Sequence, residues 1–461
     1  MGFRRLLKTV SGREPRPDAR TKADVLDALG GEGCPVCRSR QEAVRRWFFA
    51  YENDTRVDLA MRERLGRSGG FCPAHTRHLL ASGASASWLA RWVFADVARA
   101  GARALSGSKP ADTSPCPACE AAERAASGSL AALAVGLADP EVQQLLDAGD
   151  GLCVTHGVAV IDRTGRAARR AVASMLEHRL GKDPVTARDH LAGSDADIAR
   201  RRTIRETGAE AVLAAEQTAY ARPTGAVDLL LDWPCCPLCA AADRTEWRYL
   251  HWLAGLGTQG RHDAVDVRAD AMLCPRHLGD LAHLRHQGDI SALPLTDDGL
   301  LVPVAGVIEH VAGVWRTNLQ AFVQHVDTRT WSSTRDAVHI RPAAPCQVCV
   351  RRVAAVDRAM RLMHLTAADA AHADRVSQSH GVCLRHATST QLAPVWRRLA
   401  GARVGLLSYA LDESERKSRW DARWEARGAE MAIWRWAPLL LDGAVLGPVV
   451  PDGPEAAEPP S

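Results

Sequence analysis

Twelve of the thirteen cysteines follow one spacing rule, C-x2-C-x33–34-C-x2-H, which occurs four times along the 461-residue chain. The copies read CPVC…CPAH, CPAC…CVTH, CPLC…CPRH and CQVC…CLRH, with 34, 33, 34 and 33 residues between the two parts of each copy. A single CxxC pair is a weak signal, whereas four complete sets at nearly constant spacing indicate metal binding. The sixteen candidate metal ligands are Cys34, Cys37, Cys72, His75, Cys116, Cys119, Cys153, His156, Cys236, Cys239, Cys274, His277, Cys346, Cys349, Cys383 and His386.

Each copy of the motif offers three thiolates and one imidazole. That ligand set is typical of a closed structural zinc site, in which no coordination position is left for water. We expect each copy to close its own site, so that four Zn²⁺ ions stabilise the fold and do not hydrolyse a substrate. An iron–sulfur cluster is the alternative cofactor, because three cysteines and one histidine can also hold one. Buried cysteines without any metal are the remaining interpretation.

The spacing within each motif predicts how helices position the ligands. In CPVC, Pro35 suits the first position of a helix, so Cys34 and Cys37 are expected to flank a first helical turn. Cys72 and His75 would open another helix in the same way. The residues between them would form an outward and a returning helix of about 14 residues, each about 21 Å long. The metal would then fasten the base of a helical hairpin, and because strand signals are few, we expect an all-α fold.

The four copies fall into two pairs, which suggests tandem duplication of a two-site helical unit. The first unit would span residues 31–190 and the second residues 230–415. The remaining segments are expected to be an N-terminal arm (1–30), a linker helix (191–229), a Trp/Arg-rich C-terminal helix with an apolar segment (416–451) and a disordered tail (452–461).

The paired CPxC…GxCxxH pattern resembles a family of bacterial helical proteins whose members commonly have about half this length and carry two such sites. The resemblance covers residues 31–190 and 230–400 and departs at Gln347, where the family pattern has proline. It implies a metal-stapled helical fold. It implies no activity, because none is assigned to that family.

Charge and motif content exclude several classes of function. The formal net charge is +4, and four Zn²⁺ ions bound by twelve thiolates would cancel it, which disfavours nucleic-acid binding driven by overall charge. The sequence has no GxGxxG, Walker, GxSxG or HExxH motif, so an enzyme has no motif in its support. Residues 1–20 lack the apolar core of a secretory signal, and the apolar stretch 436–451 is too interrupted to span a bilayer. We therefore expect a cytoplasmic protein, with reduced cysteines.

These observations favour a zinc-binding helical scaffold that binds another protein. The alternative is a redox- or metal-responsive regulator whose thiolate–zinc or iron–sulfur sites are the sensor. Cys235, which adjoins the candidate ligand Cys236, is a redox thiol, an alternative metal ligand or a small packed side chain. Trp420 and Trp424 would share one face of the C-terminal helix, which either docks on the bundle or contacts a partner or a membrane surface.

Overall fold

The computed structural model describes residues 17–55, 58–80, 86–107, 115–193, 226–232, 235–254, 272–282, 296, 302–328, 340–388, 392–422 and 424–443. All regular elements in these ranges are helices, which confirms the expected all-α class. The helices are α1 (Ala19–Gly30), α2 (Pro35–Ala50), η1 (Tyr51–Thr55), α3 (Leu59–Arg67), α4 (Pro73–Leu80), α5 (Ala86–Ser106), α6 (Pro117–Gly136), α7 (Pro140–Ala148), α8 (Val154–Ile161), α9 (Arg166–Leu180), α10 (Pro184–Ala192), α12 (Ala226–Asp232), α13 (Pro237–Leu253), α15 (Pro275–Ala282), α16 (Val302–Thr328), α17 (Gln347–Ala368), η4 (Ala370–His372), α18 (Ala373–Gln378), α19 (Leu384–Thr388), α20 (Pro394–Lys417), η5 (Trp420–Ala422), η6 (Ala429–Arg435) and α21 (Ala437–Leu441).

The CxxC motifs begin the long helices, as the sequence predicts. Cys34, Cys116, Cys236 and Cys346 are the N-cap residues of α2, α6, α13 and α17. Proline occupies the first turn of the first three of these helices, where its missing N–H leaves no hydrogen bond unmade. The CxxH motifs begin four short helices, α4, α8, α15 and α19.

The two CxxC helices of each half lie antiparallel along one another. The start of α2 shares a core with the far part of α6, through Val36 and Leu133, whereas Phe48 near the end of α2 shares a second core with Ala118. In the second half Leu238 and Met363 pack together, so α13 and α17 are paired in the same way.

The expected hairpin of two equal helices is therefore wrong. Helix α2 has 16 residues and α6 has 20, whereas the helices that follow them, α3 and α7, have only 9 each. At 1.5 Å per residue, α3 and α7 are each about 14 Å long, whereas α2 and α6 are about 24 Å and about 30 Å long. The chain cannot come back to the start of its own hairpin, and each CxxH motif stays near the far end.

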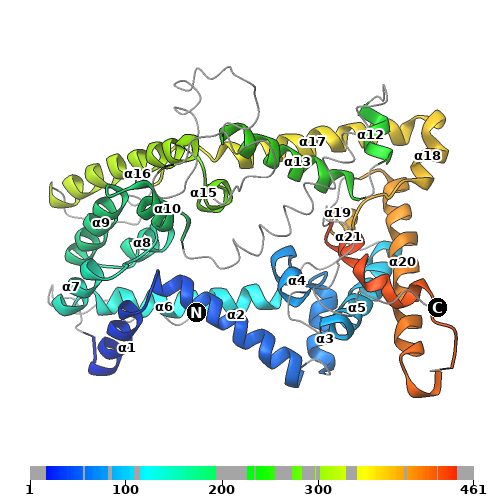
Figure 1. Ribbon diagram of the computed structural model, residues 1–461, viewed down its shortest axis with the longest axis horizontal. Helices are drawn as coiled ribbons and strands as arrows, with labels where there is room; N and C mark the ends of the chain where they lie inside the picture. The colour runs from blue at the N-terminus through cyan, green and yellow to red at the C-terminus, as the bar shows by residue number, and fades with distance from the viewer. Residues whose placement is uncertain are drawn as a thin grey trace.

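The two halves of the chain pack on each other reciprocally. Helix α20 of the second half lies along α5 of the first, and α9 of the first half lies along α16 of the second. In Figure 1 the described helices form a frame, with α2 and α6 along one long side and α16, α13 and α17 along the other. The largest core cluster contains residues of both halves, such as Leu176 and Ile308. The halves thus share their hydrophobic core.

Both terminal segments differ from expectation where the structure describes them. Residues 19–30 of the expected arm form α1, which buries Val25 and Leu29. In place of one long helix, Trp420–Ala422 and Ala429–Arg435 are short 3-10 helices, and the second of them packs against α20. Lys417 holds this fold through an ion pair to Glu430 at 2.9 Å. Residues 194–225 of the expected linker helix (191–229) and the expected tail 452–461 lie outside the described residues.

Candidate metal centres

The structure gathers all sixteen candidate ligands into four clusters of three cysteines and one histidine. The grouping is not the one expected from the sequence, because each CxxC motif meets the CxxH motif of the other copy in its half. The clusters are site A (Cys34, Cys37, Cys153, His156), site B (Cys72, His75, Cys116, Cys119), site C (Cys236, Cys239, Cys383, His386) and site D (Cys274, His277, Cys346, Cys349).

The antiparallel helix pairs explain this exchange. Helix α2 begins at site A and ends near site B, whereas α6 begins at site B and runs back toward site A. Each pair of long helices therefore carries one site at each end. The second half repeats this arrangement, with site C at the start of α13 and site D at the start of α17.

Distances within the clusters fit tetrahedral coordination. In all four sites the histidine turns Nδ1 toward the cysteines, and the Sγ–Nδ1 distances are 3.2–3.5 Å. One Sγ–Sγ pair in each site is 3.6–4.0 Å apart. Zinc–ligand bonds of about 2.3 Å to sulfur and about 2.0–2.1 Å to nitrogen give tetrahedron edges of about 3.8 Å and about 3.5 Å, respectively. The four side chains surround a volume suited to one metal ion.

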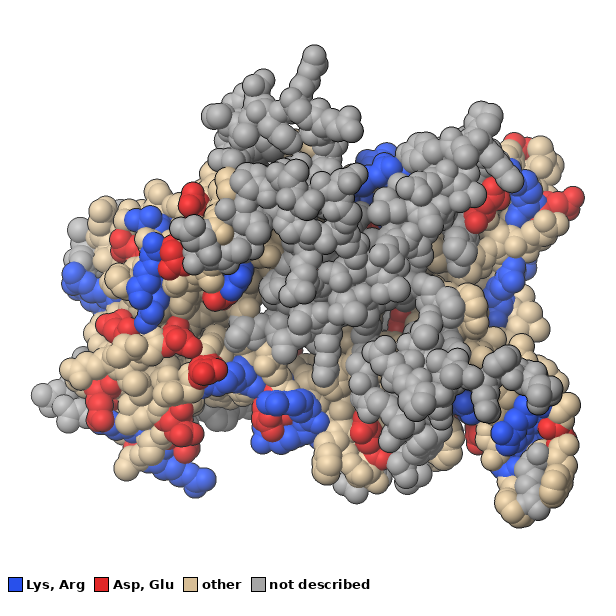
Figure 2. All heavy atoms as spheres, in the orientation of Figure 1, with Lys and Arg blue, Asp and Glu red and all other residues tan. Residues whose placement is uncertain are grey.

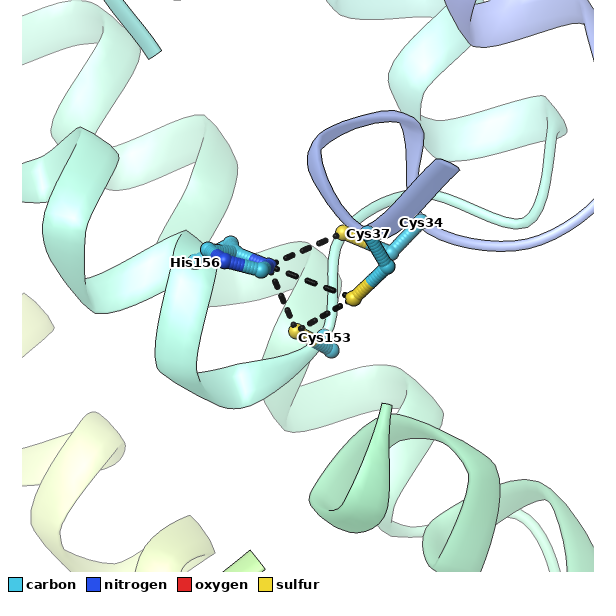
Figure 3. Close-up of side chains that lie close together, drawn as sticks. All are labelled: Cys34, Cys37, Cys153 and His156. Carbon is cyan, nitrogen blue, oxygen red and sulfur yellow. Dashed lines mark hydrogen bonds between the residues drawn. The ribbon is translucent and has the colours of Figure 1, made fainter. Parts of the chain in front are cut away.

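Site A illustrates how the elements deliver the ligands. Cys34 and Cys37 come from the start of α2, and Cys153 and His156 from the start of α8 (Figure 3). The His156 Nδ1 atom lies 3.5, 3.4 and 3.2 Å from the sulfur atoms of the three cysteines. Both helix starts turn backbone N–H groups toward the site, which favours the thiolate form that metals require.

The cysteines within a site influence one another's protonation. Hydrogen bonds from Cys119 and Cys72 lower the pKa of Cys116 to about 3, whereas the same interactions raise the pKa of Cys119 well above its usual range. A hydrogen bond from Cys274 likewise lowers the pKa of Cys346 to about 3, and the pKa of Cys274 rises. In both sites the neighbouring groups thus favour the thiolate form of some cysteines over others, and a bound divalent cation would favour it for all three.

Two glycines close corresponding faces of sites A and C, and no sequence pattern marks either of them. Gly193 follows α10 with φ +75°, and a Cβ there would lie 3.3 Å from Cys37 Sγ. Gly443 follows α21 with φ +70°, and its Cβ would lie only 2.2 Å from Cys239 Sγ. Helices α10 and α21 therefore act as covers over these two sites, and both covers require glycine at the point of contact.

Site D is the least buried of the four and has a distinct polar surrounding. Its Cys349 is exposed and its other two cysteines are half-buried, whereas sites A, B and C each contain at least one fully buried cysteine. Behind the ring of His277 lies Glu246, whose Oε1 atom is 3.4 Å from Nε2. Glu246 is a group that the sequence analysis missed, since a single glutamate on a helix gives no signal.

The other singled-out residues have structural surroundings. Cys235 is buried against Ala240 and Leu439, and burial raises the pKa of its thiol. His78 packs its ring 4.4 Å from that of Phe48. These contacts agree with packing roles.

The surface carries both signs of charge and some exposed aromatic side chains. On the face shown in Figure 2, Lys and Arg are interspersed with Asp and Glu over the described residues. Trp420 and Trp424 are 77% and 82% exposed, whereas Trp434 is buried. Among the described helices, none has the length and apolar character needed to cross a membrane.

Comparison with known proteins adds no identity. No family model, no curated protein and no solved structure matches this chain.

Proposed function

We propose that this chain is a zinc-binding helical scaffold in which sites A–D are structural Cys3His sites. The observation that carries the proposal is that protein side chains supply all four corners of each tetrahedral cluster. A site closed in this way leaves no position for a substrate or a reactive water, so the metal contributes folding free energy. All thirteen cysteines are free thiols, which supports a reducing, cytoplasmic location.

The resemblance to bacterial helical proteins with paired CPxC…GxCxxH motifs supports the same proposal. In this interpretation the chain is a tandem form with two such units. The corresponding order of elements around the two site pairs supports the duplication.

Metal analysis of anaerobically purified chain, with an absorption spectrum of the same sample, tests the proposal. We expect about four zinc ions per chain and no visible absorption band, because Zn²⁺ has a filled d shell. A brown sample containing iron would contradict the zinc assignment and make the iron–sulfur alternative the correct one.

We further propose that the scaffold presents a surface to another protein. Leu406, Tyr409, Trp420 and Trp424 are 67–82% exposed and lie on α20 and the segment that follows it. Exposed aromatic side chains of this kind are enriched at protein interfaces. A photo-crosslinking residue at position 409 should capture one defined partner in cells, and Trp420→Ser should reduce that capture. Binding of the chain to lipid vesicles instead would favour peripheral membrane contact.

One observation favours the second candidate, a redox- or metal-responsive regulator. Cys349 in site D is exposed, and an accessible zinc thiolate is open to oxidants. Hydrogen peroxide, with two protons from the solvent, would take two electrons from a pair of these thiolates, giving one disulfide, two molecules of water and a released metal ion. Unchanged metal content after mild peroxide treatment would contradict this candidate.

A further inference from the structure

We propose that Glu246 is a positioning residue for site D, holding the ring of His277 so that Nδ1 faces the three cysteines. The inference rests on the proposed metal-binding function. His277 is 1% exposed, and its Nε2 atom points away from the cysteines toward Glu246 Oε1 at 3.4 Å. A carboxylate that accepts from the outer nitrogen of a metal-binding histidine fixes the ring and makes it a stronger ligand.

The carboxylate of Glu246 is itself held in place. Glu246 is 2% exposed, and a buried charge requires opposite charges nearby. Arg352 Nη1 lies 2.7 Å from Oε2, and Arg276 Nη2 lies 3.5 Å from Oε1. Arg276 belongs to α15 with His277, and Arg352 belongs to α17 with Cys346 and Cys349. The ion pairs thus join the three elements that carry and surround the site.

Site B provides an internal comparison, because it occupies the corresponding place in the first half. Its surroundings at the equivalent positions, counted from each motif, are apolar. There the ring of His75 has an aromatic neighbour, with the Phe48 ring centroid 6.0 Å away. At the same distance in sequence from the corresponding cysteine motifs, the first half has Val44 in place of Glu246, Ala74 in place of Arg276, and Ala122 in place of Arg352. The polar shell therefore belongs to site D and is not a general part of the motif.

The exposure of site D explains why it would need this support. Cys349 is exposed, so water and competing ligands reach this site more readily than the others. Glu246, His277 and Asp280 also have the composition of a metal-binding group. However, the guanidinium group of Arg276 contacts both carboxylates: its Nε lies 3.7 Å from Asp280 Oδ2, and its Nη2 faces Glu246. The positive charge of Arg276 therefore already neutralises the acidic groups that a metal ion would need. This arrangement favours a positioning role for Glu246, at ion-pair distance behind His277, over a fifth metal ion.

The test uses the full chain loaded with four zinc ions and titrated with a chromophoric chelator. In Glu246→Val, one zinc ion should be released at a roughly 10- to 100-fold lower chelator concentration, and the other three should be unchanged. Glu246→Gln keeps a hydrogen-bond acceptor, so its effect should be smaller. Glu120→Gln is the matched control, because Glu120, which directly follows the CxxC motif of site B, also pairs with an arginine, Arg64. It should release all four ions as the wild type does.

A spectroscopic measurement separates positioning from general stability. With ¹¹³Cd²⁺ in the four sites, Glu246→Gln should shift one resonance and leave three in place, and this variant carries the test if Glu246→Val does not fold. Unchanged release and unchanged resonances would overturn the inference while the four-metal function stands. Equal weakening at all four sites would also overturn it. A wild-type chain that binds no metal would contradict the proposed function itself.

Discussion

Two glycines, Gly193 and Gly443, bring the backbone into close contact with the cysteines of candidate metal sites. Both have positive φ, and both face the second cysteine of a CxxC motif and the cysteine of a CxxH motif. Only glycine combines this backbone conformation with so little bulk. The two positions differ in the space available for a Cβ atom, so alanine should weaken metal binding more at position 443 than at position 193.

We expect Gly443→Ala to abolish metal binding at site C, because its Cβ would lie 2.2 Å from Cys239 Sγ and 2.8 Å from Cys383 Sγ. Gly193→Ala should retain the ion at site A with reduced affinity, since the corresponding distances are 3.3 and 3.5 Å. Gly405→Ala on α20 is the control, because nothing lies within 4 Å of its Cβ. Metal content per chain measures the effect, and equal content in Gly443→Ala and wild type would refute it.

The members of the four Cys3His clusters could be predicted from the sequence, whereas their grouping and their surroundings could not. Cysteine and histidine at fixed spacing can be recognised as candidate metal ligands, because few functions other than metal binding require that pattern. Glu246 and Gly443 belong to residue types that occur throughout the chain, and only the packing of distant helices brings them to a site. The same limit explains Trp420 and Trp424, whose expected shared helix face is replaced by turns held to the end of α20.

At the scale of elements, the exchange of motifs between copies makes the sharpest prediction. Cys37→Ser with Cys153→Ser alters one site, so about three metal ions should remain per chain. Cys37→Ser with Cys72→Ser alters two sites, A and B, and about two should remain. Closure of each copy on itself would give the reverse numbers, so metal analysis of the two double variants decides between the arrangements.

The expectation that each copy closes its own site was wrong, because motif spacing alone lets any CxxC be matched with any CxxH. The starts of α2 and α6 were correctly predicted from cysteine and proline. The lengths of the following helices, α3 and α7, decide where the chain returns, and helix ends are less well marked than helix starts. Two helices of equal length were expected in each hairpin. Because α3 and α7 are short, the CxxH motif of each copy stays near the far end of its CxxC helix and meets the CxxC motif of the other copy.

Metal removal should act first on the shortest helices. Helices α4, α8 and α15 have eight residues each and α19 has five, whereas isolated helices below about 12–15 residues are marginal in water. Their stability therefore depends on the ligands at their starts. Chelation should raise amide hydrogen exchange in these four helices before α5 or α20, and added zinc should reverse it. Unchanged exchange in all four would contradict the structural role of the metals.

At the scale of the whole molecule, the covers and the long helices join one half to the other. Helix α10, which covers site A, packs on α15 of site D. The Thr76 hydroxyl of α4, next to the ligand His75, donates to Asp442 Oδ2 at 2.5 Å, and Asp442 precedes the glycine over site C. Site A is thus linked to site D, and site B to site C, across the boundary between the halves. The second core cluster crosses the same boundary, with Leu384 and Leu407 packed among first-half residues.

This reciprocal packing resembles an isologous dimer contained in one chain, in which the same kind of contact is made twice. Residues 1–205 and 206–461, expressed together as separate chains, should therefore copurify in equal amounts with about four metal ions per pair. Gly101→Leu should weaken the association, because a Cβ on α5 would lie 2.5 Å from a methyl group of Leu384. Overpacking of this kind costs about 1–3 kcal/mol, or roughly 5- to 150-fold in affinity.

Gly128→Leu is the matched control, since nothing lies within 4 Å of its Cβ on the outer face of α6. Because the largest core draws on both halves, either half expressed alone should leave apolar surface exposed and aggregate, and two separately stable monomers would show that the cores are independent.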